Sequence, residues 1–217
     1  MMLIADAPVA RATDAQTAQP VSQSGEIPKA RWDHRPGSAA WTLSAMDALA
    51  NHGVPLVQSV PRDIAAWCPG YPTANPEQRA AFWVGFLSTL AKYESTYRAT
   101  AVGGGGKWFG LLQILPGTAR GYGCRARSGG ELKDGGSNLS CAIRIMARTV
   151  TRDGAIATHE GRWRGVAADW GPMRDASKRA DMSAWLRGQR YCAINKSPRP
   201  QPRPNILNTR RSARNMR

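Results

Sequence analysis

Large apolar side chains recur at helical spacing in the middle of the chain. Phe82, Phe86, Leu90 and Glu94 are four residues apart, so a helix would place all four on one face. Asn75 followed by Pro76 is the pairing of a capping residue with a proline that is typical of a helix N-terminus. We therefore predict a long helix that starts at residue 76 and carries Glu94 near its end.

Four other segments show the same kind of pattern, and no alternating strand of useful length lies between them. The predicted helices are one capped by Ser38 through Trp41, Met46 and Leu49 to Gly53; one opened by Pro116 that ends near Gly123; one that begins at Asn138, turns Ile143, Met146 and Val150 inward and ends at Gly154; and one from Ser177 to Tyr191 with Met182, Trp185 and Leu186. The predicted fold class is all-α.

Glu94 is the unusual member of the apolar stripe. A carboxylate on this face would be partly desolvated, which disfavours its charged form and raises its pKa. That is the requirement for a general acid that must still hold a proton near neutral pH. The alternative is that a glutamate at a helix end has simply reached solvent.

The residues that follow Glu94 carry a recognisable order of motifs. Glu94-Ser95-Thr96-Tyr97 leads into a glycine-rich turn and then into the block Gly110-Leu111-Leu112-Gln113-Ile114-Leu115-Pro116-Gly117-Thr118-Ala119. This set resembles the transglycosylase domain of soluble lytic transglycosylases, which reads Glu-Ser, an aromatic residue, Gly-Leu-Met-Gln and then Pro-x-Thr-Ala. The resemblance covers roughly residues 76 to 193 and implies a lysozyme-like helical domain.

The resemblance also implies roles for individual residues. Glu94 would be the catalytic acid and then base, Ser95 would hydrogen-bond near it, and Gln113 would contact the sugar beside Gly110. Ordinary helix capping and loop polarity are the alternatives for Ser95 and Gln113. Trp108, next to the glycine-led block, is the best candidate for stacking on a sugar ring.

The chain departs from the family pattern in four places. Leu112 stands where methionine is usual, and the family's serine is replaced within Gly103 to Gly106. The spacing from Glu94 to Gln113 is one residue longer than in the family. The later Ala-Tyr-Asn segment of the family has its nearest match at Ala167-Ala168-Asp169-Trp170-Gly171-Pro172. Trp163, Trp170 or Tyr191 could supply the missing aromatic residue, and Asp169 could add a second carboxylate to the cleft.

The resemblance implies a peptidoglycan lytic transglycosylase. Such an enzyme cleaves the β-1,4 bond between N-acetylmuramic acid and N-acetylglucosamine, and the 6-hydroxyl of the muramic acid attacks its own anomeric carbon to leave a 1,6-anhydro end. Two alternatives stay open. One is a hydrolytic muramidase that uses Asp169 as the second carboxylate, and the other is a non-catalytic protein that binds peptidoglycan or helps to assemble it.

The chain contains four cysteines without a Cys-x-x-Cys pair, which argues against a metal site. Two disulfides, Cys124–Cys141 and Cys68–Cys192, are expected out of three connectivities, and four free thiols in a reducing compartment are the alternative. The three histidines are scattered, and His159-Glu160 lacks the second histidine of a zinc protease motif. We expect no metal and no cofactor.

The net charge of +15 comes partly from the C-terminal tail. Residues 195–217 form a Pro- and Arg-rich basic tail without acidic residues, residues 1–30 read as a disordered leader or linker, and the domain is expected over 31–194 with its motif-bearing core at 76–193. No nucleic-acid-binding motif accompanies the charge, so anionic surfaces of a bacterial envelope are the favoured partners beside the glycan strands.

Disulfides and a peptidoglycan substrate imply a protein of the periplasm or cell envelope. The first residues, Met1 to Ala7, lack the positive region and the long apolar stretch of a signal peptide. Three explanations are open: translation starts upstream of Met1, a presequence has been removed, or the protein leaves the cell with secretion or phage-like particle machinery.

Overall fold

The computed structural model describes residues 27–194, and helices account for most of the regular structure. The all-α prediction is confirmed. The predicted leader lies outside the described residues except for 27–30, and the predicted basic tail, 195–217, lies wholly outside them. Within 27–30, Ala30 is packed into the core at 2% exposure.

The helices follow one another with short connections. They are α1 (Ser38–Ala50), α2 (Val54–Gln58), α3 (Ile64–Trp67), α4 (Pro76–Glu94), α5 (Pro116–Gly121), α6 (Gly135–Asp153), α7 (Val166–Asp169) and α8 (Ala176–Arg187). Four 3-10 turns, η1 (Tyr71–Thr73), η2 (Glu131–Lys133), η3 (Gly171–Arg174) and η4 (Arg190–Cys192), complete the helical structure of this region. The strands are β1 (Val102–Gly103) and β2 (Trp108–Phe109), which pair antiparallel.

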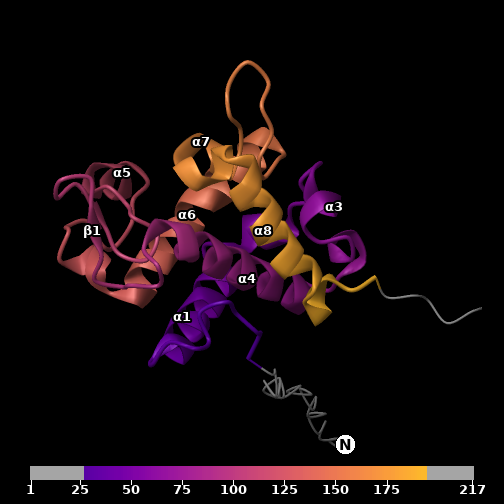
Figure 1. The fold of residues 1–217 in the computed structure, drawn as a ribbon, viewed down its shortest axis with the longest axis horizontal. Helices are drawn as coiled ribbons and strands as arrows, with labels where there is room; N and C mark the ends of the chain where they lie inside the picture. The colour runs from indigo at the N-terminus through magenta and orange to yellow at the C-terminus, as the bar shows by residue number, and fades with distance from the viewer. Residues whose placement is uncertain (1–26, 195–217) are drawn as a thin grey trace, which may run out of the picture.

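Helix α4 runs through the centre of the molecule, and α1, α2 and α8 pack against it (Figure 1). Its start is fixed by a capping box, in which the Asn75 side chain accepts from the Gln78 backbone N–H and the Gln78 side chain accepts from that of Asn75. Phe82, Phe86 and Leu90 are fully buried, as the stripe predicts. Each such side chain stabilises the fold by about 1.5–3 kcal/mol.

Residues 96–134 form a separate lobe on one side of α4, which we call the hairpin lobe. It contains β1, β2 and α5, and Figure 1 shows it to the left of the central helix. The disulfide Cys124–Cys141 joins the end of this lobe to α6. A second disulfide, Cys68–Cys192, joins the segment after α3 to η4 near the end of the described chain. Both pairings agree with those expected from the sequence, and no described cysteine is free.

Three helix starts differ from prediction, and in two of them an earlier aspartate provides the cap. Helix α6 begins at Gly135 and is capped by Asp134, whose carboxylate accepts from the Ser137 backbone N–H, and Asn138 lies inside the helix. Helix α8 is likewise capped by Asp175 instead of Ser177, and it ends at Arg187 rather than continuing to Tyr191. Helix α1 starts at Ser38 itself, after Gly37 in the left-handed conformation (φ 78°). An aspartate competes well with serine and asparagine as a cap.

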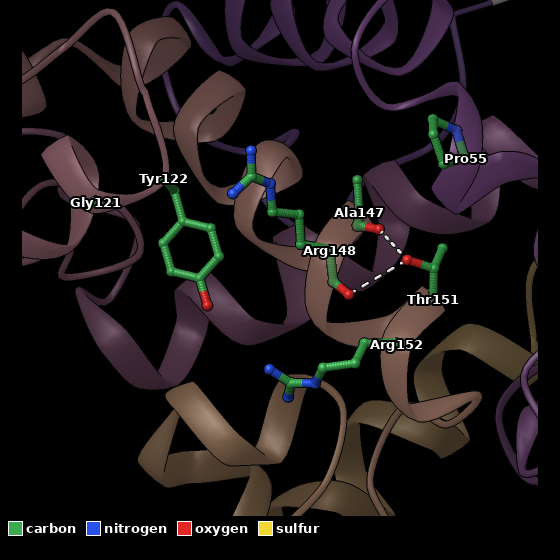
Figure 2. Close-up of a pocket in the computed structure, with 7 residues that line it drawn as sticks. All are labelled: Pro55, Gly121, Tyr122, Ala147, Arg148, Thr151 and Arg152. Carbon is green, nitrogen blue, oxygen red and sulfur yellow. Dashed lines mark hydrogen bonds between the residues drawn. The ribbon is translucent and has the colours of Figure 1, made fainter.

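Ala147, Arg148, Thr151 and Arg152 lie on one face of the last two turns of α6, which we call its outer face. With Pro55 of α2 and Tyr122 after α5, this face lines a pocket of about 730 Å³ (Figure 2). Among residues 27–194, no helix is both long enough and apolar enough to cross a membrane.

Candidate active site

Glu94 is the last residue of α4, where the buried helix reaches the hairpin lobe. The side chain is half-buried, and burial raises the pKa of its carboxyl from an ordinary value of 4.5 to about 7. The charge of Lys178 on α8 opposes this rise and is smaller in effect. Glu94 is therefore partly protonated at neutral pH, as a general acid must be.

The chain leaves α4 through an unusual turn. Thr96 and Tyr97 both have positive φ angles, 53° and 58°, and a β-branched residue such as threonine seldom adopts this conformation. The turn is held by Tyr97, which is buried and whose backbone N–H donates to the Ala91 carbonyl at 3.3 Å. Such backbone strain is often found at functional sites. It fixes the direction in which the chain departs from Glu94.

Ser95 is 3% exposed, and its hydroxyl donates to the Ala91 carbonyl at 3.3 Å. This bond is the common contact of a serine with the carbonyl one helical turn earlier. The Ser95 hydroxyl therefore already has a partner within the helix, which competes with the hydrogen bond near Glu94 that the family resemblance implied.

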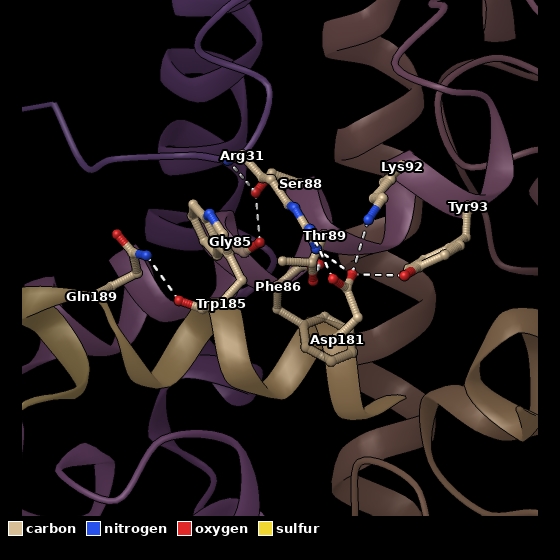
Figure 3. Close-up of polar contacts among 10 residues, drawn as sticks. All are labelled: Arg31, Gly85, Phe86, Ser88, Thr89, Lys92, Tyr93, Asp181, Trp185 and Gln189. Atoms are coloured by element: carbon tan, nitrogen blue, oxygen red, sulfur yellow. Dashed lines mark hydrogen bonds and ion pairs between the residues drawn. The ribbon is translucent and has the colours of Figure 1, made fainter. Parts of the chain in front are cut away.

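The last turn of α4 is tied to α8 by the carboxylate of Asp181 (Figure 3). This carboxylate accepts two hydrogen bonds from the Arg31 guanidinium, at 2.5 and 3.0 Å, one from Lys92 Nζ at 3.1 Å and one from the Tyr93 hydroxyl at 2.6 Å. The bond from Arg31 is the largest cause holding the pKa of Asp181 well below its usual range. Lys92 and Tyr93 directly precede Glu94, so the cluster fixes the helix end that carries the acid.

Gly110 begins the turn that follows β2 in the hairpin lobe, and only glycine fits there. Its φ is 81°, and a Cβ atom would lie 2.1 Å from the Leu132 carbonyl oxygen and 2.2 Å from Asn138 Nδ2. The fully buried Asn138 holds the turn: its amide donates to the carbonyls of Phe109 and Leu132, and its oxygen accepts from the Leu112 backbone N–H, each at 2.9 Å. Asn138 is thus the internal support of the motif and not a helix cap.

Gln113 lies at the end of this turn and has a positive φ of 48°. Its amide nitrogen donates to the carbonyls of Gly110 at 2.9 Å and Ala101 at 3.3 Å, which joins the turn to the residue before β1. A Cβ atom on Gly103 would lie 2.2 Å from its amide oxygen. Gln113 therefore has internal partners, besides any contact with a sugar.

Trp108 is 45% exposed on the hairpin, and its ring lies over Gly104. A Cβ atom on Gly104 would approach the ring to 2.0 Å, so the glycine is required by the close packing of the indole. One face of an exposed indole is the surface on which a sugar ring can stack.

Asp169 and Trp170 lie in the segment after α6, at the end of α7 and directly after it. Asp169 is an exposed residue at the end of α7, although partial burial of its carboxyl raises its pKa. Trp170 is 5% exposed, and its indole N–H donates to the Leu112 carbonyl at 3.0 Å. The tryptophan thus binds the turn of the hairpin lobe from within rather than presenting an open ring face.

The other two aromatic candidates lie elsewhere. The Tyr191 hydroxyl donates to the Lys29 carbonyl at 3.3 Å and packs against Gly85. Gly85 is nine residues before Glu94 on the same helix, so the two residues are about 13 Å apart along the helix axis at a rise of about 1.5 Å per residue. Trp163 packs edge-on against His159, with the Arg179 guanidinium 5.2 Å from its ring centroid.

Tyr122 was not singled out from the sequence. It follows α5 directly, and its pKa is raised by burial and then by the charge of Asp169, which indicates that the two residues are near each other. The local sequence around Tyr122 does not indicate this proximity, because Asp169 is 47 positions away in the sequence. Within residues 27–194, no cluster of three or more histidine, cysteine or acidic side chains could hold a metal ion.

A largely helical domain whose central helix ends at a half-buried carboxylic acid, followed in the chain by a small hairpin lobe with a glycine-led turn, is consistent with a lysozyme-like domain. The family described as "Transglycosylase SLT domain" matches residues 72–168, which confirms the resemblance that the sequence motifs indicated. The match includes Glu94, Trp108, Gly110 and Gln113, and it ends one residue before Asp169.

Solved structures of the protein named Bd0314 DslA are similar to this chain. Its wild-type form 2 has 29% sequence identity and a TM-score of 0.70, covering 78% of this chain and 100% of that chain. Two glutamate-to-glutamine mutants of the same protein match over the same shares, with 28% and 29% identity and TM-scores of 0.70 and 0.71. No curated protein matches the chain.

Proposed function

We propose that the protein is a peptidoglycan lytic transglycosylase in which Glu94 alone serves as acid and base. The observation that carries this proposal is the position of Glu94 at the end of α4, where burial raises its pKa to about 7. The protonated carboxyl would donate its proton to the bridging oxygen as the bond from that oxygen to the anomeric carbon breaks. The resulting carboxylate would accept the proton of the muramyl 6-hydroxyl as its oxygen bonds to the same carbon.

The charge environment favours one carboxylate over two. Burial and Lys178 account for the pKa shift of Glu94, without a contribution from another carboxylate. The charge of Asp169 instead raises the pKa values of Tyr122 and Arg152. The chain also has no acidic residue between positions 95 and 130, which include the hairpin. A hydrolase with a second carboxylate 5–9.5 Å away would be expected to have such a group near its acid.

The remaining residues would bind the glycan. Trp108 offers the exposed ring face, and Gln113 and Gly110 shape the turn of the hairpin lobe. Ser95, Asp169 and Trp170 are proposed to support the site from its two sides. Peptidoglycan as a substrate also places the working protein in the periplasm or cell envelope, where the two disulfides would be stable.

The test is mass spectrometry of the fragments that the protein releases from purified peptidoglycan. We expect 1,6-anhydromuramyl ends from the wild-type protein and none from Glu94→Gln. Glu131→Gln is the control, because this glutamate is exposed in the hairpin lobe and its carboxylate bonds only to Arg127 and Ser128 among the described residues. Reducing ends, heavier by one water, would identify a hydrolase, and no release by the wild-type protein would favour a binding protein.

A further inference from the structure

The pocket on the outer face of α6 is built from three separate parts of the chain. Pro55 comes from the start of α2, Tyr122 follows α5, and Arg148 and Arg152 lie one turn apart on α6 (Figure 2). A volume of about 730 Å³ is within the range of sites that take small ligands or parts of peptides. Glu94 does not line it, so the pocket is distinct from the acid.

The polar lining is cationic. The Arg148 guanidinium lies over the Tyr122 ring, 6.0 Å from its centroid, and forms no hydrogen bond or ion pair within the part of the chain described. Arg152 is different, because both its Nε and Nη2 donate to Asp153 at 2.8 Å. Asp153 is almost fully buried and also accepts from the Gly165 backbone N–H, so it neutralises much of the charge of Arg152. Arg148 therefore provides the uncompensated charge.

Tyr122 adds a donor beside the two arginines. Burial and the charge of Asp169 raise the pKa of this tyrosine, so its hydroxyl keeps its proton. Figure 2 shows the ring on one side of the pocket and the two arginine side chains on the other. Pro55 and Ala147 supply apolar lining. One free guanidinium, one hydroxyl donor and an apolar edge together suit a carboxylate on a short aliphatic stem.

The pocket also adjoins the segments assigned to glycan binding. Tyr122 directly follows α5, the helix after the turn at Gly110, and the charge of Asp169, on α7, raises the pKa of both Tyr122 and Arg152. The next residue, Trp170, is bonded to the Leu112 carbonyl in that turn. Asp169 and Trp170 thereby link the pocket to the turn that we assign to glycan binding.

We propose that this pocket binds a carboxylate of the peptide stems that the glycan strand carries, with Arg148 as the principal contact. The proposal rests on the proposed function, since the stems reach the pocket as part of the peptidoglycan substrate. The negative charge of Asp169 opposes such a ligand, so the favourable interaction depends on Arg148. The pocket would thereby make the protein prefer peptide-bearing strands to bare ones.

The test compares kcat/KM on peptidoglycan with kcat/KM on glycan strands whose peptides an amidase has removed. In Arg148→Gln, we expect the ratio of the two values to fall about 5- to 20-fold, because a charge-assisted hydrogen bond is lost. Arg144→Gln is the matched control: it removes the same charge one turn earlier on α6, outside the pocket. An unchanged ratio in Arg148→Gln, or an equal fall in the control, would overturn the proposal.

A binding measurement separates this proposal from the proposed function. Calorimetry with a free tetrapeptide stem and the Glu94→Gln protein should show binding that Arg148→Gln, in the same background, weakens by a similar factor. This result does not require catalysis, so it stands even if no anhydro product is ever found. If inorganic phosphate binds as tightly as the peptide, the pocket is a general anion site and the assignment to peptide stems is wrong.

Discussion

Replacing Glu94 with glutamine should stabilise the protein at alkaline pH while it removes the activity. Burial raises the pKa of the Glu94 carboxyl from 4.5 to about 7, so the folded protein holds this proton over a pH range in which the unfolded chain has lost it. In that range the free energy of unfolding falls as pH rises. Glutamine has nearly the same shape and does not titrate, so it avoids this loss.

The size of the effect follows from the pKa. Each pKa unit corresponds to about 1.4 kcal/mol, so the whole rise corresponds to roughly 3 kcal/mol. Because the side chain is only half-buried, solvent screening reduces the expected gain to about 1–2 kcal/mol. For a domain of this size that is a rise in Tm of roughly 2 to 8 °C at pH 8. Below about pH 4.5 the two proteins should melt together, since both then carry a neutral side chain.

Thermal melts of both proteins from pH 4 to pH 9 provide the assay. Glu77→Gln is the control, because Glu77 is exposed in the first turn of the same helix and its replacement should give no gain at any pH. A Glu94→Gln protein that is no more stable than the wild type at pH 8 would refute the reasoning. It would mean that Glu94 is not desolvated and has no means of holding its proton at neutral pH.

Three further predictions concern the groups around the acid. Asp181→Asn should lower the free energy of unfolding by about 1–2 kcal/mol at pH 7 after allowance for solvent screening, and urea titrations should show the difference fading below about pH 4, because the paired carboxylate has a lowered pKa. Asn138→Ala should cost about 3 kcal/mol or more in thermal melts, because three buried backbone groups lose their partner; an unchanged Tm would show that the turn does not depend on it. In Lys178→Met, the alkaline limb of the pH–rate profile should move to higher pH, since Lys178 lowers the pKa of Glu94, and a move to lower pH would contradict this electrostatic role.

Local patterns in the sequence were sufficient for the central helix and the acid. The apolar stripe and the Asn75–Pro76 start act over a few residues, and the structure places Phe82, Phe86 and Leu90 in the core as they predict. Helix starts were less certain wherever two capping residues stood close together, as Asp134 and Asn138 do. Both disulfides could be paired because few connectivities exist for four cysteines.

The contacts that hold the site could not be predicted in this way. Asp181 meets Arg31 across 150 positions of sequence, and the Trp170 indole meets the Leu112 carbonyl across 58. Nothing in the local sequence of either residue differs from that of an ordinary surface aspartate or core tryptophan. Only the packing of α8 and of the segment after α7 brings these partners together. The pocket at Arg148 escaped prediction for the same reason.

The hydrogen bond from Trp170 to the Leu112 carbonyl has a consequence for how a long polymer is handled. It joins the hairpin lobe to the helical part of the molecule. Because the indole is buried, breaking the bond would leave its N–H without a partner, which is unfavourable. This contact therefore restricts the relative motion of the two parts, and in the proposed function a glycan strand would meet a site that needs little ordering on binding. Selection among glycans would then depend on which strands fit the existing site, without a step in which a lid closes.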